Sequence, residues 1–417
     1  MKLTDKHTLY ASYLGYITQA IINNLPPLLF VTFQTQFDIP LTKISALITM
    51  NFVVQIIVDL ISAKYVDKIG YRPSIVCAHV LAVAGLVLLG ILPFVMDPFL
   101  GIVIAMILNA IGGGLTEVLI SPIVESLPGD EKASAMSVLH SFYCWGHMAV
   151  VILSTFYFVA VGTQHWQYLP FLWALLPLVN IFLFARVPMH VLVAEEDRIP
   201  ITELFKKKIF WLFFFLMLCA GAAEQAMSQW SSYFAERGLG VSKTLGDLLG
   251  PCAFALTMGL SRLIYGKRGS KMNVQKFIVF SAVLCLGAYL LTVFSPYPVL
   301  SLIGCGICGF SVGIFWPGVF STAAQTYPAG GTALFALLAV AGDLGCGGGP
   351  GMVGMISDAA ANGFDAIKSI IPTGAETELK VGMLFAIIFP IGMIAGMAIL
   401  KKMTHTDSEK EQNKTTR

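Results

Sequence analysis

Charged residues are scarce in this chain of 417 residues: only 12% are Asp, Glu, Lys or Arg, and 56% are hydrophobic. A soluble globular chain carries about 25% charged residues, because it must cover its surface with groups that bind water. The mean hydropathy of +0.78 points the same way. The composition excludes an ordinary soluble protein and predicts an all-α integral membrane protein that crosses the bilayer many times.

Motifs of energy conversion and catalysis are also missing. The chain has no GxxxxGK[ST] stretch to cradle the phosphates of ATP. No group of His, Cys and Asp has the spacing of a metal site, and the net charge of +2 gives no reason to expect a nucleic-acid partner. We therefore expect no enzyme activity, no cofactor, no metal and no nucleic acid.

What the chain does have is apolar runs of the length that a membrane helix needs, about 20 residues. Polar turns such as LPGDEK and SPYP separate successive runs. Twelve membrane-spanning helices are predicted, at 8–33, 43–66, 72–95, 98–127, 133–160, 166–187, 208–235, 243–265, 273–294, 297–326, 329–358 and 379–401.

The twelve predicted spans divide into two halves at the longest internal polar stretch. A shift of 199 residues, from Lys68 to Lys267, brings the loop after the second span onto the loop after the eighth. Two pseudo-symmetric six-helix bundles of the parallel-repeat type are the simplest account. The predicted parts are a bundle over 1–187, a cytoplasmic linker over 188–207, a second bundle over 208–402 and a cytoplasmic tail over 403–417.

Lys and Arg gather in alternate loops, which predicts orientation because cytoplasmic loops carry the excess of positive charge. The basic loops include both ends of the chain and the central KKK stretch. We expect a multi-pass protein of the cytoplasmic (inner) membrane with both termini in the cytoplasm. The first residues, MKLTDKHTLYASYLGY, lack a signal-peptide pattern, so we expect them to be retained.

The loop after the second span reads DKIGYR, from Asp67 to Arg72. It resembles the loop motif of the major facilitator superfamily, Gly-x-x-x-Asp-[Arg/Lys]-x-Gly-[Arg/Lys]-[Arg/Lys]. Two departures are Ala63 in place of the leading Gly, and Tyr71 within the basic pair. The resemblance covers the whole transmembrane chain. It implies the major facilitator fold, in which spans one, four, seven and ten line a cavity.

Three stretches resemble the fucose permease-type sugar:proton symporters: GGGLTEVLISPIVESLP in the fourth span, LHSFYCWG in the fifth and GAAEQAMSQWSSYF in the seventh. Two positions depart from that group. Ser121 replaces the Asn before Pro122, and Asn24 stands where the group has an acid. The resemblance implies a transporter that moves a sugar with protons.

Glu117 is the strongest candidate for proton coupling. A charge at the bilayer centre costs about 2.5–3.5 kcal/mol on insertion scales, and burial disfavours the charged form of a carboxyl group. A carboxyl group in this apolar run is therefore suited to exchange a proton, although a purely structural, paired Glu also fits. Residues expected to contact the solute, or alternatively to hold helices together, are Asn24, His140, His147, Glu224, Gln225, Trp230, Trp316 and Asp343.

No Lys or Arg is expected at the depth of these acids. An anionic solute needs cations, so a neutral sugar or polyol, or a cation, is favoured. A second group is expected near the cytoplasmic helix ends, either as a charge lock that holds the outward-open state or as solvated loop charges. Its members are Asp59, Asp67, Arg72, Glu125 and Arg262.

The function predicted from the sequence is secondary active transport of a small neutral solute, with protons as partner, by a monomer in the lipid bilayer. Two alternatives within the same class remain open. One is a proton-coupled exporter of lipophilic cations, in which Glu117, Glu224 and Asp343 contact the cation. The other is an uncoupled facilitator, suggested by Asn24. A membrane receptor or scaffold is disfavoured because the polar tails are short.

Overall fold

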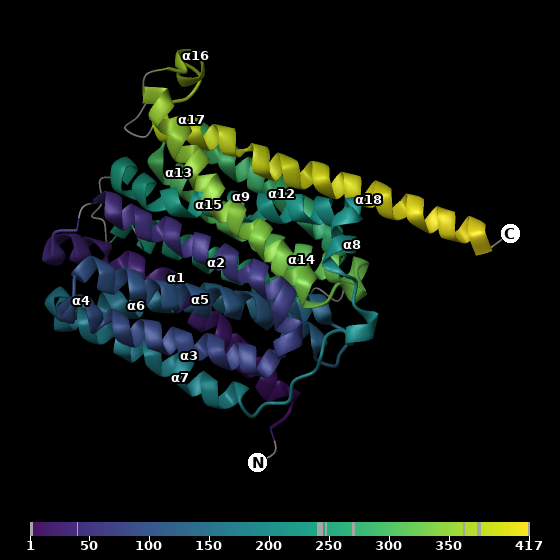
Figure 1. The fold of residues 1–417 in the computed structure, drawn as a ribbon. Helices are drawn as coiled ribbons and strands as arrows, with labels where there is room; N and C mark the ends of the chain where they lie inside the picture. The colour runs from purple at the N-terminus through teal and green to yellow at the C-terminus, as the bar shows by residue number, and fades with distance from the viewer. Residues whose placement is uncertain are drawn as a thin grey trace. The chain divides into compact units, whose positions relative to one another are not determined.

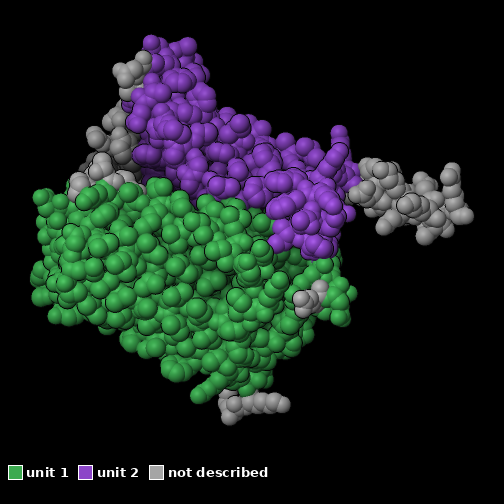
Figure 2. All heavy atoms as spheres, viewed as in Figure 1, with its two compact units in different colours: residues 1–198, 328–340 green, residues 199–327, 341–417 purple. Residues whose placement is uncertain are grey.

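The computed structural model describes residues 3–39, 41–239, 245–246, 248–268, 272–361, 363–372 and 377–415, and these residues form helices and no strand. The chain divides into two compact units (Figure 2). Unit 1 comprises residues 1–198 and 328–340, and unit 2 comprises residues 199–327 and 341–417. The predicted all-α class is confirmed.

Unit 1 is a bundle of long helices that run alongside one another, with α1 next to α5 and α6, and α3 next to α5 and α7 (Figure 1). Its elements are α1 (Asp5–Phe37), α2 (Leu41–Ile69), α3 (Tyr71–Leu89), α4 (Leu92–Val95), α5 (Pro98–Ser126), α6 (Lys132–Val161), η1 (Thr163–Tyr168), α7 (Leu169–Phe184), η2 (Glu195–Asp197) and η5 (Pro328–Gly330).

Unit 2 is a second bundle, in which α9 packs against α13 and α18, and α12 against α13. Its elements are α8 (Ile201–Lys206), α9 (Lys208–Leu239), η3 (Leu248–Cys252), α11 (Ala253–Arg268), α12 (Val274–Phe294), α13 (Pro298–Val312), α14 (Phe315–Thr326), α16 (Asp365–Lys368), α17 (Thr377–Ala386) and α18 (Ile388–Thr415). The helix α15 (Gly331–Ala361) is shared, because its residues up to Val340 belong to unit 1 and the rest to unit 2.

Eleven helices in the described part of the chain are long and apolar enough to cross a membrane. The first span, α1, is not among them, because Gln19, Asn23 and Asn24 interrupt its apolar run. It is a continuous helix of 33 residues, however, which exceeds the length that a bilayer requires. With α1, each of the twelve predicted spans coincides with a helix or with two helices in succession.

Prolines explain two of the interruptions within the spans. A proline has no N–H to donate to the carbonyl four residues earlier. Pro317 therefore leaves the carbonyl of Gly313 without its helical partner, and α13 ends at Val312 before α14 begins at Phe315. Pro390 does the same to Ala386, the last residue of α17. In both cases one predicted span becomes two helices.

A buried side-chain contact ties three helices of unit 1. His79 Nδ1 lies 2.8 Å from the carbonyl oxygen of Ile75 in the same helix. A carbonyl only accepts, so Nδ1 carries the hydrogen and Nε2 is the acceptor. The Asn180 amide nitrogen lies 2.9 Å from that Nε2 and 3.0 Å from the carbonyl oxygen of Ala11. One amide thereby links α7 to α3 and α1.

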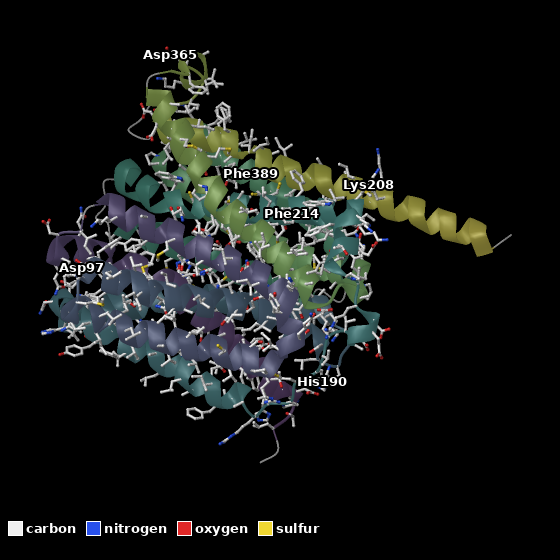
Figure 3. All side chains as sticks on the ribbon, viewed as in Figure 1. Asp97, His190, Lys208, Phe214, Asp365 and Phe389 are labelled. Atoms are coloured by element: carbon white, nitrogen blue, oxygen red, sulfur yellow. The ribbon has the colours of Figure 1, made fainter. Side chains whose placement is uncertain are left out.

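The two ends of unit 1 are marked by polar residues (Figure 3). Asp97 caps the start of α5, where its side chain accepts a hydrogen bond of 2.9 Å from the backbone N–H of Leu100. His190 lies at the opposite end of the unit, 2.9 Å from Asp5 at the start of α1. The helices α1 and α5 are therefore antiparallel, and α5 ends where α1 begins.

Candidate functional site

Three consecutive glycines shape the middle of α5. Successive residues on a helix point about 100° apart, so Gly112, Gly113 and Gly114 face three different neighbours. A Cβ at Gly112 would lie 2.7 Å from the carbonyl oxygen of Ala78 in α3, and one at Gly114 would lie 3.1 Å from Val58 in α2. The glycines let α2 and α3 approach α5 closely at this depth.

The middle glycine makes room for polar side chains. A Cβ at Gly113 would lie 3.0 Å from Gln19 Oε1 and 3.5 Å from Gln55 Nε2. Gln19 Nε2 donates a hydrogen bond of 2.9 Å to Glu117 Oε2, and Gln55 Nε2 donates one of 3.0 Å to Asn23 Oδ1. An amide of α1 thus contacts the half-buried carboxylate of α5, and the Gln55–Asn23 pair lies beside Gly113, one turn earlier on α5.

A second polar contact lies one turn further along the same two helices. Tyr16 is three residues before Gln19 on α1, so these two residues lie on one helix face. Ser121 is four residues after Glu117 on α5, so it shares a face with Glu117. The Tyr16 hydroxyl lies 2.9 Å from Ser121 Oγ and 3.2 Å from His140 Nε2. Ser121 Oγ is 3.4 Å from the same nitrogen. All three side chains are buried.

The other unit 1 residues predicted to contact solute lie outside these contacts. The amide of Asn24 donates a hydrogen bond of 2.8 Å to the carbonyl oxygen of Ala20 in its own helix. Its neighbour Asn23 is the residue that reaches Gln55. His147 is half-buried on α6, two turns beyond His140. Their roles stay predictions.

In unit 2, a buried ion pair lies halfway along α9. Arg262 Nη2 of α11 lies 3.4 Å from Glu224 Oε2 of α9, and both side chains are less than a tenth exposed. Arg262 Nε donates a hydrogen bond of 2.8 Å to the carbonyl oxygen of Gly313. This is the carbonyl that Pro317 leaves without a helical partner. The guanidinium therefore satisfies both a carboxylate and an orphaned backbone oxygen.

This pair corrects one expectation. The sequence predicted no Lys or Arg at the depth of the embedded acids, and it placed Arg262 with the charges near the helix ends. The Arg262 side chain instead reaches Glu224, halfway along α9. The prediction failed because it followed the backbone position of Arg262, whereas a long side chain carries its charge well away from its own Cα.

Other predicted solute contacts of unit 2 lie beside glycines of α15. The Trp316 ring lies against Gly342, where a Cβ would collide with it, and the next residue, Asp343, is buried. Trp230 is half-buried, and a Cβ at Gly354 would lie 3.4 Å from its ring. Gln225, next to Glu224, is also half-buried. Gly342 therefore provides the space that the Trp316 ring occupies, whereas a side chain at Gly354 would only touch the Trp230 ring.

The predicted charge lock contains one real cluster. Asp67 Oδ1 accepts a hydrogen bond of 2.6 Å from the hydroxyl of Thr332, which lies 2.7 Å from the Tyr71 hydroxyl. Asp67 Oδ2 is 3.6 Å from Arg198 Nε. We call these four residues the Asp67 cluster. It connects the end of α2 and the start of α3 with the start of α15 and the segment between η2 and α8.

The other members of the predicted lock have different surroundings. Arg72 donates to the carbonyl oxygens of Phe184 and Val187, at 2.9 and 2.8 Å, and so covers the end of α7. The backbone oxygen of Glu125 accepts a hydrogen bond of 2.7 Å from Lys132. Asp59 is fully buried in α2, one turn after Gln55. Arg262 belongs to the pair with Glu224.

Sequence reasoning missed Tyr16, Gln19 and Gln55. The signal was present: Tyr16, Gln19 and Asn23 recur at spacings of three and four, which places them on one face of the first span. Gln55 is a single polar residue in the apolar run VVQIIV. Carboxylates drew attention because of their charge, whereas amides in a membrane helix are read as ordinary packing residues.

Comparisons with known proteins agree with this arrangement of membrane helices. A sequence model of the Major Facilitator Superfamily matches residues 12–350. The chain belongs to the major facilitator superfamily. Its function is accordingly membrane transport of a small molecule, and members of this family are transporters, not enzymes. No curated protein sequence matches the chain.

Three solved transporter structures are similar to this one. They are the fucose:proton symporter FucP of E. coli (TM-score 0.75, 14% identity, 94% of this chain and 98% of that chain), the proton:xylose symporter XylE (0.75, 13%, 94% and 96%) and the human organic anion transporter MFSD10 (0.69, 13%, 94% and 99%). At these identities the likeness establishes the fold of twelve membrane helices. The solute needs a separate argument.

Proposed function

We propose that this transporter moves a small neutral solute, a sugar or a polyol, together with protons by alternating access. The observation that carries the proposal is the hydrogen bond from Gln19 to Glu117. It places a carboxyl group, which can bind and release a proton, next to an amide, which can bind hydroxyl groups. The structural likeness to FucP and XylE supports the same class.

The charge balance of unit 2 supports a neutral solute. Arg262 is a cation at the depth of the embedded acids, and an unpaired cation there would favour an anion. Its guanidinium already contacts Glu224 and the Gly313 carbonyl. A buried pair of this kind carries no net charge, so the argument against an anionic solute now rests on pairing instead of absence.

Glu117 is the proposed proton carrier. Its protonation removes a charge whose presence at the bilayer centre costs about 2.5–3.5 kcal/mol on insertion scales. A neutral Glu117 would therefore lower the cost of enclosing the solute. We place the protein in the cytoplasmic membrane as a monomer, with both termini inside and residues 188–207 as the linker, because Lys and Arg gather in those segments.

The test is the external pH of a lightly buffered suspension of liposomes that contain the protein. A panel of hexoses, deoxyhexoses, pentoses and polyols is added one at a time. We expect one class of solute to raise the external pH with the wild type. The same solute should cause no pH change with Glu117→Gln. The control is Glu203→Gln, which removes a carboxylate from the exposed helix α8.

Each other result has a defined meaning. Uptake of a sugar without a pH change would replace proton coupling with facilitated diffusion, which the amide at Asn24 favours. A pH response only to lipophilic cations would replace sugar import with the exporter hypothesis. A pH response that persists in Glu117→Gln would overturn the assignment of the proton to Glu117.

A further inference from the structure

Two polar contacts follow one another between α1 and α5, and we call them the first and the second rung. The first is Gln19 with Glu117, and the second is Tyr16 with Ser121 and, from α6, His140. On α5 the residues are Glu117 and Ser121, and on α1 they are Gln19 and Tyr16. One helical turn, about 6 Å of rise, separates the rungs. The second rung lies toward the end of unit 1 at which α1 begins and α5 ends.

The second rung consists of groups that pass protons. Two hydroxyls each hold one donor and two acceptor sites, and an imidazole nitrogen either donates or accepts. The three polar atoms lie within 2.9 to 3.4 Å of one another. All three side chains are almost fully buried, so bulk solvent does not compete for them.

We propose that Tyr16, Ser121 and His140 are a proton relay that carries the proton of Glu117 toward the membrane surface at which α1 begins. The inference rests on the proposed proton coupling at Glu117 and extends it. It gives His140 a role in proton movement in place of the solute contact expected from the sequence. It also gives a reason for Ser121, where the resembling symporters have Asn.

The transfer conserves atoms and charge. Glu117 turns from Gln19 toward Ser121, which is one turn away on the same face of α5, and gives its proton to Ser121 Oγ. The Ser121 hydrogen moves to the Tyr16 oxygen as the Tyr16 hydrogen moves to His140 Nε2. The result is a Glu117 carboxylate, an imidazolium at His140 and two intact hydroxyls. Only O–H and N–H bonds change.

The charged surroundings of His140 come from two helices. The helix α5 presents Glu117 and, eight residues further on, Glu125, whose backbone oxygen accepts from Lys132. The helix α1 presents Tyr16 and, one turn away, Tyr13, which stacks on Phe142 at 4.1 Å between ring centroids. The helix η1 also contacts α6, but it follows the far end of that helix.

The test applies a pH jump to the solute-free protein in liposomes on a solid-supported membrane and records the transient proton current. The wild type should give a transient that Glu117→Gln abolishes. Tyr16→Phe, which removes only a hydroxyl, and His140→Gln should slow the transient by about tenfold or more, since a positioned proton-transfer group contributes about 100-fold or more to a rate. The total charge moved should stay unchanged.

The matched control is Ser141→Ala. Ser141 is buried next to His140 on α6, and its hydroxyl donates to the Val138 carbonyl in its own helix. It should keep the wild-type rate. A structural effect would lower the amplitude and thermal stability together, whereas loss of the relay slows the current and increases its H2O/D2O rate ratio.

Two results would overturn the relay, and they are distinguishable. Wild-type rates in both Tyr16→Phe and His140→Gln would remove the relay and leave proton coupling at Glu117 standing. A wild type without a Glu117-dependent current would remove the coupling proposal and the relay with it. Should His140→Gln fail to fold, Tyr16→Phe and Ser121→Ala decide the question.

Discussion

Glu224 and Arg262 lie 3.4 Å apart, and each is less than a tenth exposed. Removing one partner of such a pair leaves the other charge buried, which costs about 3–5 kcal/mol, whereas removing both together costs far less. We expect Arg262→Met to lower the thermal unfolding midpoint strongly, since it also removes the hydrogen-bond donor of the Gly313 carbonyl. Adding Glu224→Gln should recover much of that loss.

The double-mutant cycle is measured by thermal unfolding of the purified protein in detergent. Arg262→Met, Glu224→Gln and the double variant give the coupling between the two residues. A double variant whose loss equals the sum of the single losses would mean that the two residues do not interact across the 3.4 Å separation.

Glu203 provides the opposite case at the surface. Lys206 donates a hydrogen bond of 2.6 Å to Glu203 Oε1, and this hydrogen bond, with the charge of Lys206, lowers the pKa of Glu203. A depressed pKa means that the contribution to stability is present at neutral pH and is lost as the pH falls through that pKa. Exposed pairs contribute little.

We therefore expect Glu203→Gln to lower the unfolding midpoint only slightly at pH 7, because the pair is exposed. In acid the two curves should converge, since the wild type there loses the small increment that the variant never had. Thermal unfolding between pH 3 and 7 checks this expectation. A large loss of stability at neutral pH would contradict it and would disqualify the variant as a control in transport assays.

The acidic residues of the site could be predicted from the sequence, but their partners could not. Glu117 and Glu224 stood out because a carboxylate within an apolar run has no ordinary explanation. Their partners did not, since the identity of a partner depends on how helices far apart in the chain are placed. Gln19 and Glu117 are 98 positions apart, and nothing in either local stretch specifies their contact.

At the scale of the helix, the triple glycine of α5 sets the packing around the site. A Cβ at Gly112 would lie 2.7 Å from the Ala78 carbonyl oxygen and 2.9 Å from the Ala82 nitrogen. Both are backbone atoms, so a methyl group forces α3 and α5 apart. We expect Gly112→Ala to destabilise the protein by about 1–3 kcal/mol, as overpacking does.

The control for this prediction is Gly287→Ala. Gly287 lies within α12, and a Cβ there would meet nothing within 4 Å. Alanine favours a helix over glycine by about 0.5–1 kcal/mol, so this variant should be neutral or stabilising. Thermal unfolding of both variants checks the pair. Equal effects would mean that helix propensity, and not the contact of α3 with α5, governs Gly112.

Helix positions were predictable because length and apolarity determine where a chain can span a bilayer. The breaks within these helices were harder to predict from the sequence. Pro317 and Pro390 interrupt their spans, but Pro26 and Pro27 lie inside a continuous α1. A proline only frees a carbonyl, and what then bonds to that carbonyl depends on tertiary neighbours. The capture of the Gly313 oxygen by Arg262 is such a case.

At the scale of the whole molecule, the sequence predicted two halves joined by a linker. Arg198, within the predicted linker, belongs to unit 1, and the next residue begins unit 2. What the sequence could not indicate is that residues 328–340 group with unit 1. Within this segment Thr332 contacts Asp67 and Tyr71, more than 260 positions away, and neither residue type nor spacing predicts such contacts.

The Asp67 cluster gives the last prediction. The Thr332 hydroxyl is fully buried and donates to Asp67 while it contacts the Tyr71 hydroxyl. Thr332→Val keeps the shape of the side chain but leaves Asp67 and Tyr71 without this partner, at a cost of about 1–3 kcal/mol. The matched control is Thr326→Val, because Thr326 bonds only to the Thr322 carbonyl of its own helix.

The outcome distinguishes a conformational lock from a static brace. A lock stabilises one conformation of the transport cycle, and each 1.4 kcal/mol lost from it changes the ratio of two conformations about tenfold. We expect Thr332→Val to lower the unfolding midpoint and to change the rate of solute exchange in liposomes, while Thr326→Val changes neither. A lower midpoint with an unchanged exchange rate would make the cluster a brace, because the same contacts would then be present throughout the cycle.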